Sequence, residues 1–188
     1  MKRSVMNKLV TLFPIIFFAS LACGAQSLNS NWTSDLETEL KEFTSCDDDM
    51  DCSEFSGRIL QTVYKLNDFY QPQEKRFMNV AEIIAFLQDS KSWTMLGHAY
   101  QQDVLNQAQQ YANSKKAVIA VYPGTNGVGH VALILPGELQ PSGSWGLSVP
   151  NSASFLTMDP AKSYVGKGLS YAFTKHHLKD LVIFARNY

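Results

Sequence analysis

Apolar residues in the first two thirds of the chain recur every three or four positions, which is the period of an amphipathic helix. One helix is predicted to begin near Ser34, where Ser34 and Glu37 form a capping box, and another near Asn79, where Asn79 pairs with Glu82. A longer helix is predicted at about 100–113. The region 64–77, polar and interrupted by a proline, is predicted to be a loop.

The pattern changes after residue 116, where continuous apolar runs replace the helical period. The runs 117–122 and 130–135 each end at a Pro-Gly pair and are predicted to be buried strands. Shorter apolar segments at 145–149 and 181–185 add two further predicted strands. Helices followed by strands are the order expected of an α+β domain.

A further helix is predicted to start at Cys52, because Phe55, Ile59, Val63 and Leu66 fall on one face. A thiol at a helix N-terminus lies at the positive end of the helix dipole, which favours the reactive thiolate. His130 follows a glycine-containing loop and opens one of the predicted strands. A cysteine nucleophile needs such a base, so we regard Cys52 and His130 as a candidate catalytic pair.

Composition limits the classes of function. A chain of 188 residues, 45% of them hydrophobic, has enough apolar material for a sizeable core. Its formal net charge of −1 argues against a nucleic-acid partner, which requires a basic surface.

The first 25 residues have the layout of a secretory signal peptide. Basic residues precede an apolar run at 9–21, and small residues follow it. The run is short for a membrane span, although an uncleaved anchor is the alternative. Cleavage after Ala25 would release the protein, whereas lipidation at Cys23 would tether it to a membrane, and both remain open. We therefore predict a signal peptide at 1–25 and a single domain at 26–188 in a secreted or periplasmic protein.

The segment Asp51-Cys52-Ser53-Glu54-Phe55 opening a helix, with Gly129-His130-Val131-Ala132-Leu133-Ile134 opening a strand, resembles the NlpC/P60 superfamily of papain-like cell-wall peptidases. The sequence is more similar to the first amidase effector family of type VI secretion, which also shares 92–94, 117–120 and the turn at 136–137. One departure is that Glu54 stands where the family usually has glycine.

The resemblance implies a papain-like α+β fold in which the nucleophile helix packs on an antiparallel sheet. It implies hydrolysis of peptidoglycan stem peptides, at the bond between D-glutamate and diaminopimelate, through a thioester on Cys52 with His130 as the base. The backbone amide of Cys52 would supply part of the oxyanion hole. This chemistry requires no cofactor. Stem peptides are the expected partner, a proteinaceous inhibitor is a second candidate partner, and membrane contact is expected only through a lipid anchor at Cys23.

Two alternatives remain open. In an oxidising compartment Cys46 and Cys52 would form a disulfide, which would make the chain a secreted or lipid-anchored binding module without activity. The chain would otherwise be another papain-like enzyme, either an acyltransferase or a peptidase. The resemblance implies a third polar residue after the histidine hairpin, which corresponds to the region 142–151. Ser148 and Asn151 are available there, and the sequence selects neither.

A metal site is not expected. The acidic loop at 47–51 lacks the glycine and glutamate that an EF-hand requires at its sixth and twelfth positions. The remaining histidines, His98, His176 and His177, do not have the spacing of zinc ligands on one helix, and the chain contains no CxxC pair.

Overall fold

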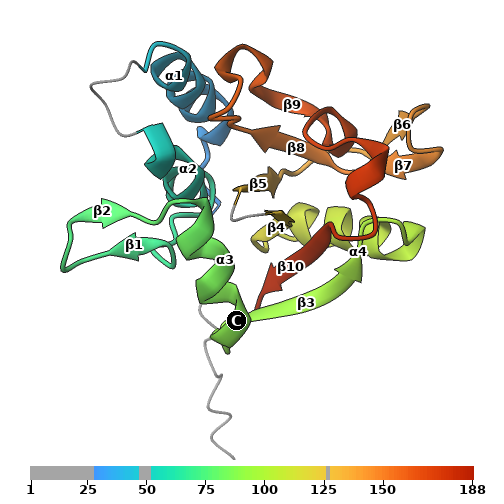
Figure 1. Ribbon diagram of the computed structural model, residues 1–188, viewed down its shortest axis with the longest axis horizontal. Coiled ribbons are helices and arrows are strands. Elements are labelled where there is room, and N and C mark those ends of the chain that lie inside the picture. Colours follow the sequence, from blue (N-terminus) through green and yellow to red (C-terminus); the bar gives the residue numbers. More distant parts are fainter. Residues whose placement is uncertain (1–27, 47–51, 126–127) are drawn as a thin grey trace, which may run out of the picture.

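The computed structural model describes residues 28–46, 52–125 and 128–188. In these ranges a sheet of six antiparallel strands is flanked by helices, so the α+β prediction is confirmed (Figure 1). The helices are α1 (Trp32–Thr44), α2 (Phe55–Tyr64), α3 (Val80–Asp89) and α4 (Gln102–Asn113), and a 3-10 turn, η1 (Cys52–Glu54), leads into α2. In spatial order the strands are β3 (Trp93–His98), β10 (Val182–Arg186), β4 (Val118–Thr125), β5 (Val128–Ile134), β8 (Asn151–Ser154) and β9 (Tyr164–Gly168).

Smaller elements lie outside the large sheet. They are two hairpins, β1 (Tyr70–Gln71) with β2 (Arg76–Phe77) and β6 (Gln140–Ser142) with β7 (Leu147–Val149), and the 3-10 turns η2 (Pro160–Lys162), η3 (Leu169–Tyr171) and η4 (Lys175–His177).

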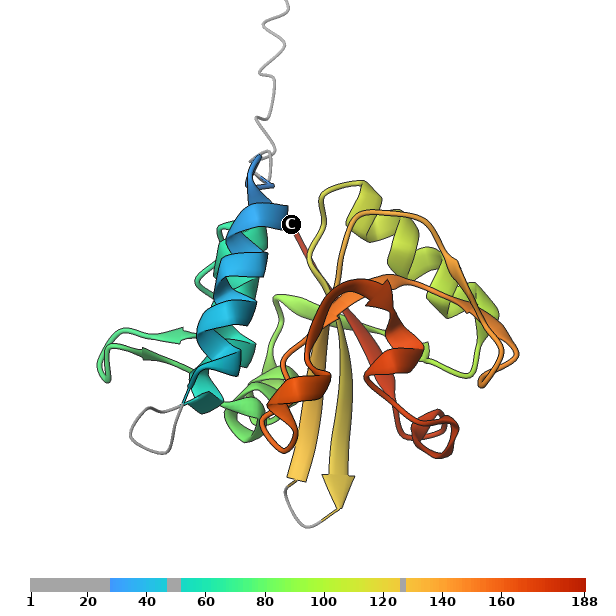
Figure 2. The same cartoon turned by 90° about the horizontal axis from the view of Figure 1, so that it is seen from above.

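The sheet separates two apolar clusters because side chains alternate between the faces of a strand. On β5, Val131 and Leu133 pack into the cluster that also holds apolar residues of α1, α2 and α3. Ala132 and Ile134 point the other way, into the cluster that includes α4. Figure 2 shows this arrangement, with the blue and teal helices on one side of the two yellow strands and the yellow-green helix on the other.

The predicted helices are present, with two corrections. The helix predicted to start at Cys52 becomes α-helical only at Phe55, because Cys52–Glu54 form the 3-10 turn η1. Asn79 and Glu82 form the expected capping box at the start of α3, with both reciprocal hydrogen bonds in place. The capping box predicted for α1 is wrong, because the helix begins two residues earlier, at Trp32. The Ser34 hydroxyl instead donates to the carbonyl of Asn31.

The predicted strands at 117–122, 130–135, 145–149 and 181–185 correspond to β4, β5, β7 and β10. The region 64–77 is not entirely a loop, because it contains the β1–β2 hairpin. Strands β3, β8 and β9 were not predicted. Strand β8 reads Asn-Ser-Ala-Ser, and its serines are buried and hydrogen-bonded, so it lacks the apolar pattern by which a buried strand is recognised.

No helix among the described residues has the length and apolar character needed to cross a membrane. The predicted signal peptide and Cys23 lie outside the described residues, as does the acidic loop at 47–51.

Candidate functional site

Cys52 is the first residue of η1 and forms a disulfide with Cys46. Cys46 follows the end of α1, and the Cα atoms of the two cysteines are 6.1 Å apart. The disulfide therefore ties the end of α1 to the turn that leads into α2. This is the bond expected if the chain is a binding module, and in this form Cys52 carries no thiol.

Cys46 and Cys52 are half-buried and pack against the cluster on the α1–α3 face. Three aromatic rings stand at the centre of this region. Phe43 of α1 makes edge-to-face contacts with Phe55 of α2 and with Phe155, which follows β8, each at 5.2 Å between ring centroids. Phe55 and Phe155 stack at 6.2 Å. The position of the disulfide is therefore set by apolar packing between two helices and the sheet.

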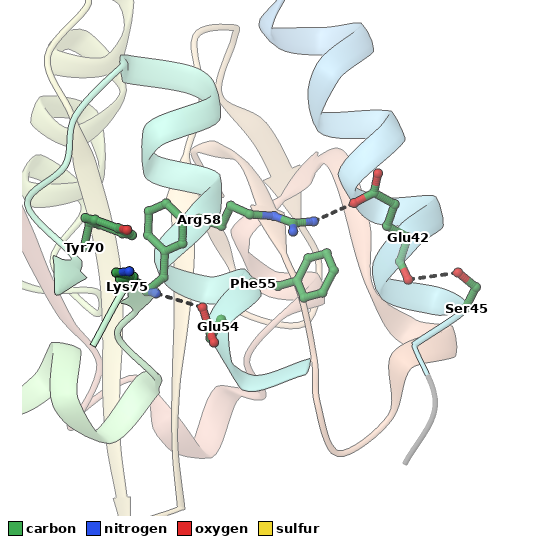
Figure 3. A pocket seen from close by; sticks show the side chains of 8 residues that line it. Glu42, Ser45, Glu54, Phe55, Arg58, Tyr70 and Lys75 are labelled. Carbon is green, nitrogen blue, oxygen red and sulfur yellow. Dashed lines mark hydrogen bonds and ion pairs between the residues drawn. The ribbon is translucent and has the colours of Figure 1, made fainter. Parts of the chain in front are cut away.

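A cavity of about 540 Å³ opens next to η1, and we call it the Glu54 pocket (Figure 3). Its walls come from the end of α1, from η1 and α2, and from the β1–β2 hairpin. The lining residues are Glu42, Ser45, Glu54, Phe55, Arg58, Tyr70, Lys75 and Phe77. Glu54 and Phe55 follow Cys52 within three residues, so this pocket lies beside Cys52 along the chain.

His130 lies on β5 opposite Tyr122 of β4. Its Nε2 atom is 2.7 Å from the Oγ atom of Ser154, a fully buried residue at the end of β8. The polar partner of His130 is thus Ser154, which lies beyond the region 142–151 in which the sequence analysis looked for one. Such a hydrogen bond fixes the orientation of the imidazole ring.

Ser148 and Asn151, the candidates suggested by the sequence, have other roles. The Ser148 backbone exchanges hydrogen bonds with the side chain of Gln102, and the Asn151 side chain donates to the carbonyl of Pro136. The register of β8 on β5 places Ala132 opposite Ser154, so Ser154 and His130 lie on the same face. A prediction of β8 and of its register would have been needed to find Ser154.

His130 also lines a cavity of about 190 Å³ together with Tyr122, Phe173 and His177. Burial lowers the pKa of His130 to about 4, and the nearby His177 contributes in the same direction. The imidazole is therefore neutral at pH 7, and in this environment it is a weaker base than an exposed histidine. Phe173 lies 5.2 Å from the His130 ring, and His177 stacks on Tyr122 at 4.2 Å.

The surroundings of Cys52 and His130 belong to opposite faces of the sheet. Cys52 packs into the cluster that contains Val131, whereas His130, one residue earlier on β5, points with Ala132 toward the α4 face. The structure thus brings Cys52 together with Cys46 and His130 together with Ser154. The pairing of Cys52 with His130 stays a prediction.

The other histidines do not assemble a metal site. Among residues 28–46, 52–125 and 128–188, no three histidine, cysteine, aspartate or glutamate side chains are grouped so as to hold a metal ion. His98 stacks on Tyr100, and the Nδ1 atoms of His98 and His177 are buried without a hydrogen-bond partner in the described part of the chain.

Comparisons with known protein families and with curated proteins found no match to this chain.

Proposed function

We propose that the chain is a secreted cysteine amidase that hydrolyses peptidoglycan stem peptides and that is held inactive in the described form by the Cys46–Cys52 disulfide. The observation that carries the proposal is the placement of the two candidate residues in an α+β fold. Cys52 opens the turn into a helix that packs on the sheet, and His130 stands on a central strand of that sheet with a polar partner. The family resemblance supplies the substrate class.

In the proposed reaction a dithiol reductant first opens the disulfide, giving one thiol on Cys46 and one on Cys52 while the reductant becomes a disulfide. The Cys52 thiol then gives its proton to His130 and attacks the amide carbonyl. The departing amine takes the proton from His130, and water hydrolyses the thioester that remains. Because His130 faces away from α2 in the described form, the proposal requires η1 and the His130 end of β5 to approach one another once the disulfide is open.

Digestion of purified sacculi tests the activity directly. The reduced protein should release peptides cut after the γ-carboxyl of D-glutamate, identified by mass spectrometry, and the oxidised protein should release none. Cys46→Ser should be active without a reductant, and Cys52→Ala should be inactive under all conditions. A reduced protein that leaves sacculi intact would refute the amidase, and release of other fragments would favour a different papain-like enzyme.

The dependence of Cys52 on His130 can be measured separately. His130→Ala should slow hydrolysis by about 10²–10⁴-fold, the usual contribution of a general base. It should also shift the pH profile of Cys52 alkylation in the Cys46→Ser protein toward the ordinary thiol pKa of about 8.5. His98→Ala and His176→Ala are the controls and should leave the profile in place. An unchanged profile in His130→Ala would show that the two residues do not form a dyad.

A second candidate function is favoured by the disulfide and by the opposite orientation of Cys52 and His130. Under this hypothesis the chain is a secreted binding module in which a structural disulfide links the end of α1 to the turn that leads into α2. Thiol titration of the protein purified from its native compartment separates the two readings. Alkylatable thiols at both Cys46 and Cys52 support the enzyme, whereas a disulfide present in every molecule, together with the absence of hydrolysis after reduction, supports the binding module.

A further inference from the structure

The Glu54 pocket is lined by two acidic and two basic residues among aromatic rings. We propose that it binds a zwitterionic amino-acid end, which carries an ammonium and a carboxylate on one carbon, and that Glu54 contacts the ammonium while Lys75 contacts the carboxylate. The inference rests on the proposed function only for the source of this group, the diaminopimelate residue of a stem peptide.

Glu54 supplies the negative side of the site. One carboxylate oxygen accepts a hydrogen bond from the backbone N–H of Phe77 at 2.8 Å, which holds the half-buried side chain in the pocket. An ionised carboxylate has about four lone-pair positions, so this single bond leaves room for the N–H groups of a ligand ammonium. Glycine is usual at this position in the family that the sequence resembles, and glycine has no such group.

Lys75 supplies the positive side. It lies in the turn between β1 and β2, with a backbone φ of +56°, and its side chain is exposed at the pocket. Among the described residues Lys75 forms no ion pair, neither with Glu54 nor with another acid. Figure 3 shows Lys75, Tyr70 and Glu54 on the same side of the pocket. A ligand carboxylate can therefore pair with Lys75 while its ammonium pairs with Glu54.

The other two charged residues of the pocket already have partners. The Arg58 guanidinium donates to Glu39 and, at 2.7 Å, to Glu42, and it lies 4.0 Å from the centre of the Phe55 ring. Figure 3 shows Arg58 extending from α2 toward Glu42 on α1. These contacts hold the Arg58 side chain between α1 and α2, where it lines the pocket. Lys75 and Glu54 are thus the charges left for a ligand, and together they complement a group with no net charge.

The pocket is held open by packing around the hairpin. A Cβ atom at Gly57 of α2 would approach the carbonyl oxygen of Met78 to 2.8 Å, so the helix and the segment after β2 are in close contact. Tyr70 and Phe77 pack edge-to-face at 5.1 Å between centroids and stiffen the hairpin. The volume of about 540 Å³ lies within the usual range of about 300–1,000 Å³ for ligand pockets. A preformed site of this kind loses less entropy when it binds.

Three dipeptides that differ only at the far end of the second residue test the assignment. The glutamyl amine of each peptide is acetylated, so that the glutamyl residue does not itself present an ammonium and a carboxylate on one carbon. At the far end, N-acetyl-γ-D-glutamyl-diaminopimelate carries both charged groups, the corresponding lysine peptide lacks the carboxylate, and the corresponding 2-aminopimelate peptide lacks the ammonium. Affinities are measured by calorimetry on the oxidised full-length protein, in which Cys52 is bonded to Cys46 and turnover does not interfere. The diaminopimelate peptide should bind about two- to fivefold more tightly than each of the others, the effect of one partly exposed charge contact.

Each variant should remove one half of this selectivity. Lys75→Gln should bind the diaminopimelate and lysine peptides equally, and Glu54→Gln should bind the diaminopimelate and 2-aminopimelate peptides equally. Lys115→Gln, which replaces another exposed lysine with positive φ, and Glu138→Gln are matched controls and should keep the full preference. Equal affinity of the wild-type protein for the three peptides, or an equal loss for all of them in both variants, would overturn the assignment.

The peptide-binding experiment and the digestion of sacculi test the two proposals independently. Selective binding without hydrolysis after reduction would refute the amidase and keep the site, now as that of a binding module. Hydrolysis of sacculi without this selectivity would keep the amidase and refute the site.

Discussion

Ser154 and Phe155 are neighbours in the chain, yet they lie in two different environments. Phe155 points to the face covered by α1 and α2, where it contacts Phe43 and Phe55, close to the disulfide-bonded cysteines. Ser154 points to the other face and binds His130. The first environment is built from large apolar rings and a covalent link. The second contains buried polar groups, including Ser152 and Gln109, that are paired by hydrogen bonds.

This difference determines which changes each face tolerates. Close-packed rings are sensitive to a loss of volume, because the surrounding residues fill a cavity only in part. Buried polar groups are sensitive to a change of charge or the loss of a partner, because water is excluded from them. Changes of size should therefore act mainly on the Cys52 face, and changes of protonation mainly on the His130 face.

The largest expected effect is that of Phe155→Ala, which removes the ring shared by Phe43 and Phe55. It should lower the free energy of unfolding by about 3–5 kcal/mol, as measured by urea denaturation. The matched variant is Ser154→Ala at the next position, which deletes one hydroxyl and should cost about 1 kcal/mol. Equal losses in the two variants would contradict the division into two faces.

Opening the disulfide should have a smaller effect. The bond closes a loop of about seven residues, for which chain entropy gives a stabilisation of about 2 kcal/mol. Cys46→Ser and reduction of the wild-type protein should lower the free energy of unfolding by similar amounts, and a reductant should change Cys46→Ser little. A reduced protein as stable as the oxidised one would show that the disulfide does not stabilise the packing of α1 against η1 and would favour a regulatory role over a structural one.

The sequence predicts most of the elements on the Cys52 face because their apolar residues recur with helical period. Helical period predicts α2, although the α-helix begins at Phe55 and not at Cys52. The Asn79–Glu82 pair predicts the capping box of α3, and continuous apolar runs predict the strands β4 and β5. The register of the strands is not accessible in this way, since a shift by one residue reverses the face of every side chain. The sequence motifs therefore predict a pairing of Cys52 with His130 without indicating which face of the sheet His130 occupies. In the structure the surroundings of the two residues lie on opposite faces.

The partner of His130 illustrates a second limit. Ser154 lies in a short strand of small residues whose burial comes from tertiary contacts and not from its own hydrophobicity. The Cys46–Cys52 disulfide was one of two readings of the same cysteines, and spacing alone does not decide between a bonded pair and a nucleophile. Both features depend on how distant segments come together, which local periodicity does not encode.

The smallest expected effect is the contribution of His130 to the pH dependence of the free energy of unfolding. The folded protein lowers the pKa of His130 from an ordinary 6.5 to about 4, so between these values the unfolded chain binds the extra proton and the folded protein does not. Stability should therefore rise with pH across this window, be fully present above about pH 6.5, and fall as pH decreases toward 4. Allowing for partial exposure to water, the difference is about 1–2 kcal/mol. It is measured as the free energy of unfolding of the wild-type protein minus that of His130→Gln, which cancels the titration of the carboxylates.

Two further variants serve as controls. His177→Gln should narrow the pH range over which stability changes, because His177 also disfavours the charged form of His130, whereas His176→Gln, at an exposed position, should leave that range unchanged. If the wild-type protein and His130→Gln lose stability in parallel between pH 6.5 and pH 4, His130 does not lie in the enclosed environment that distinguishes its face of the sheet.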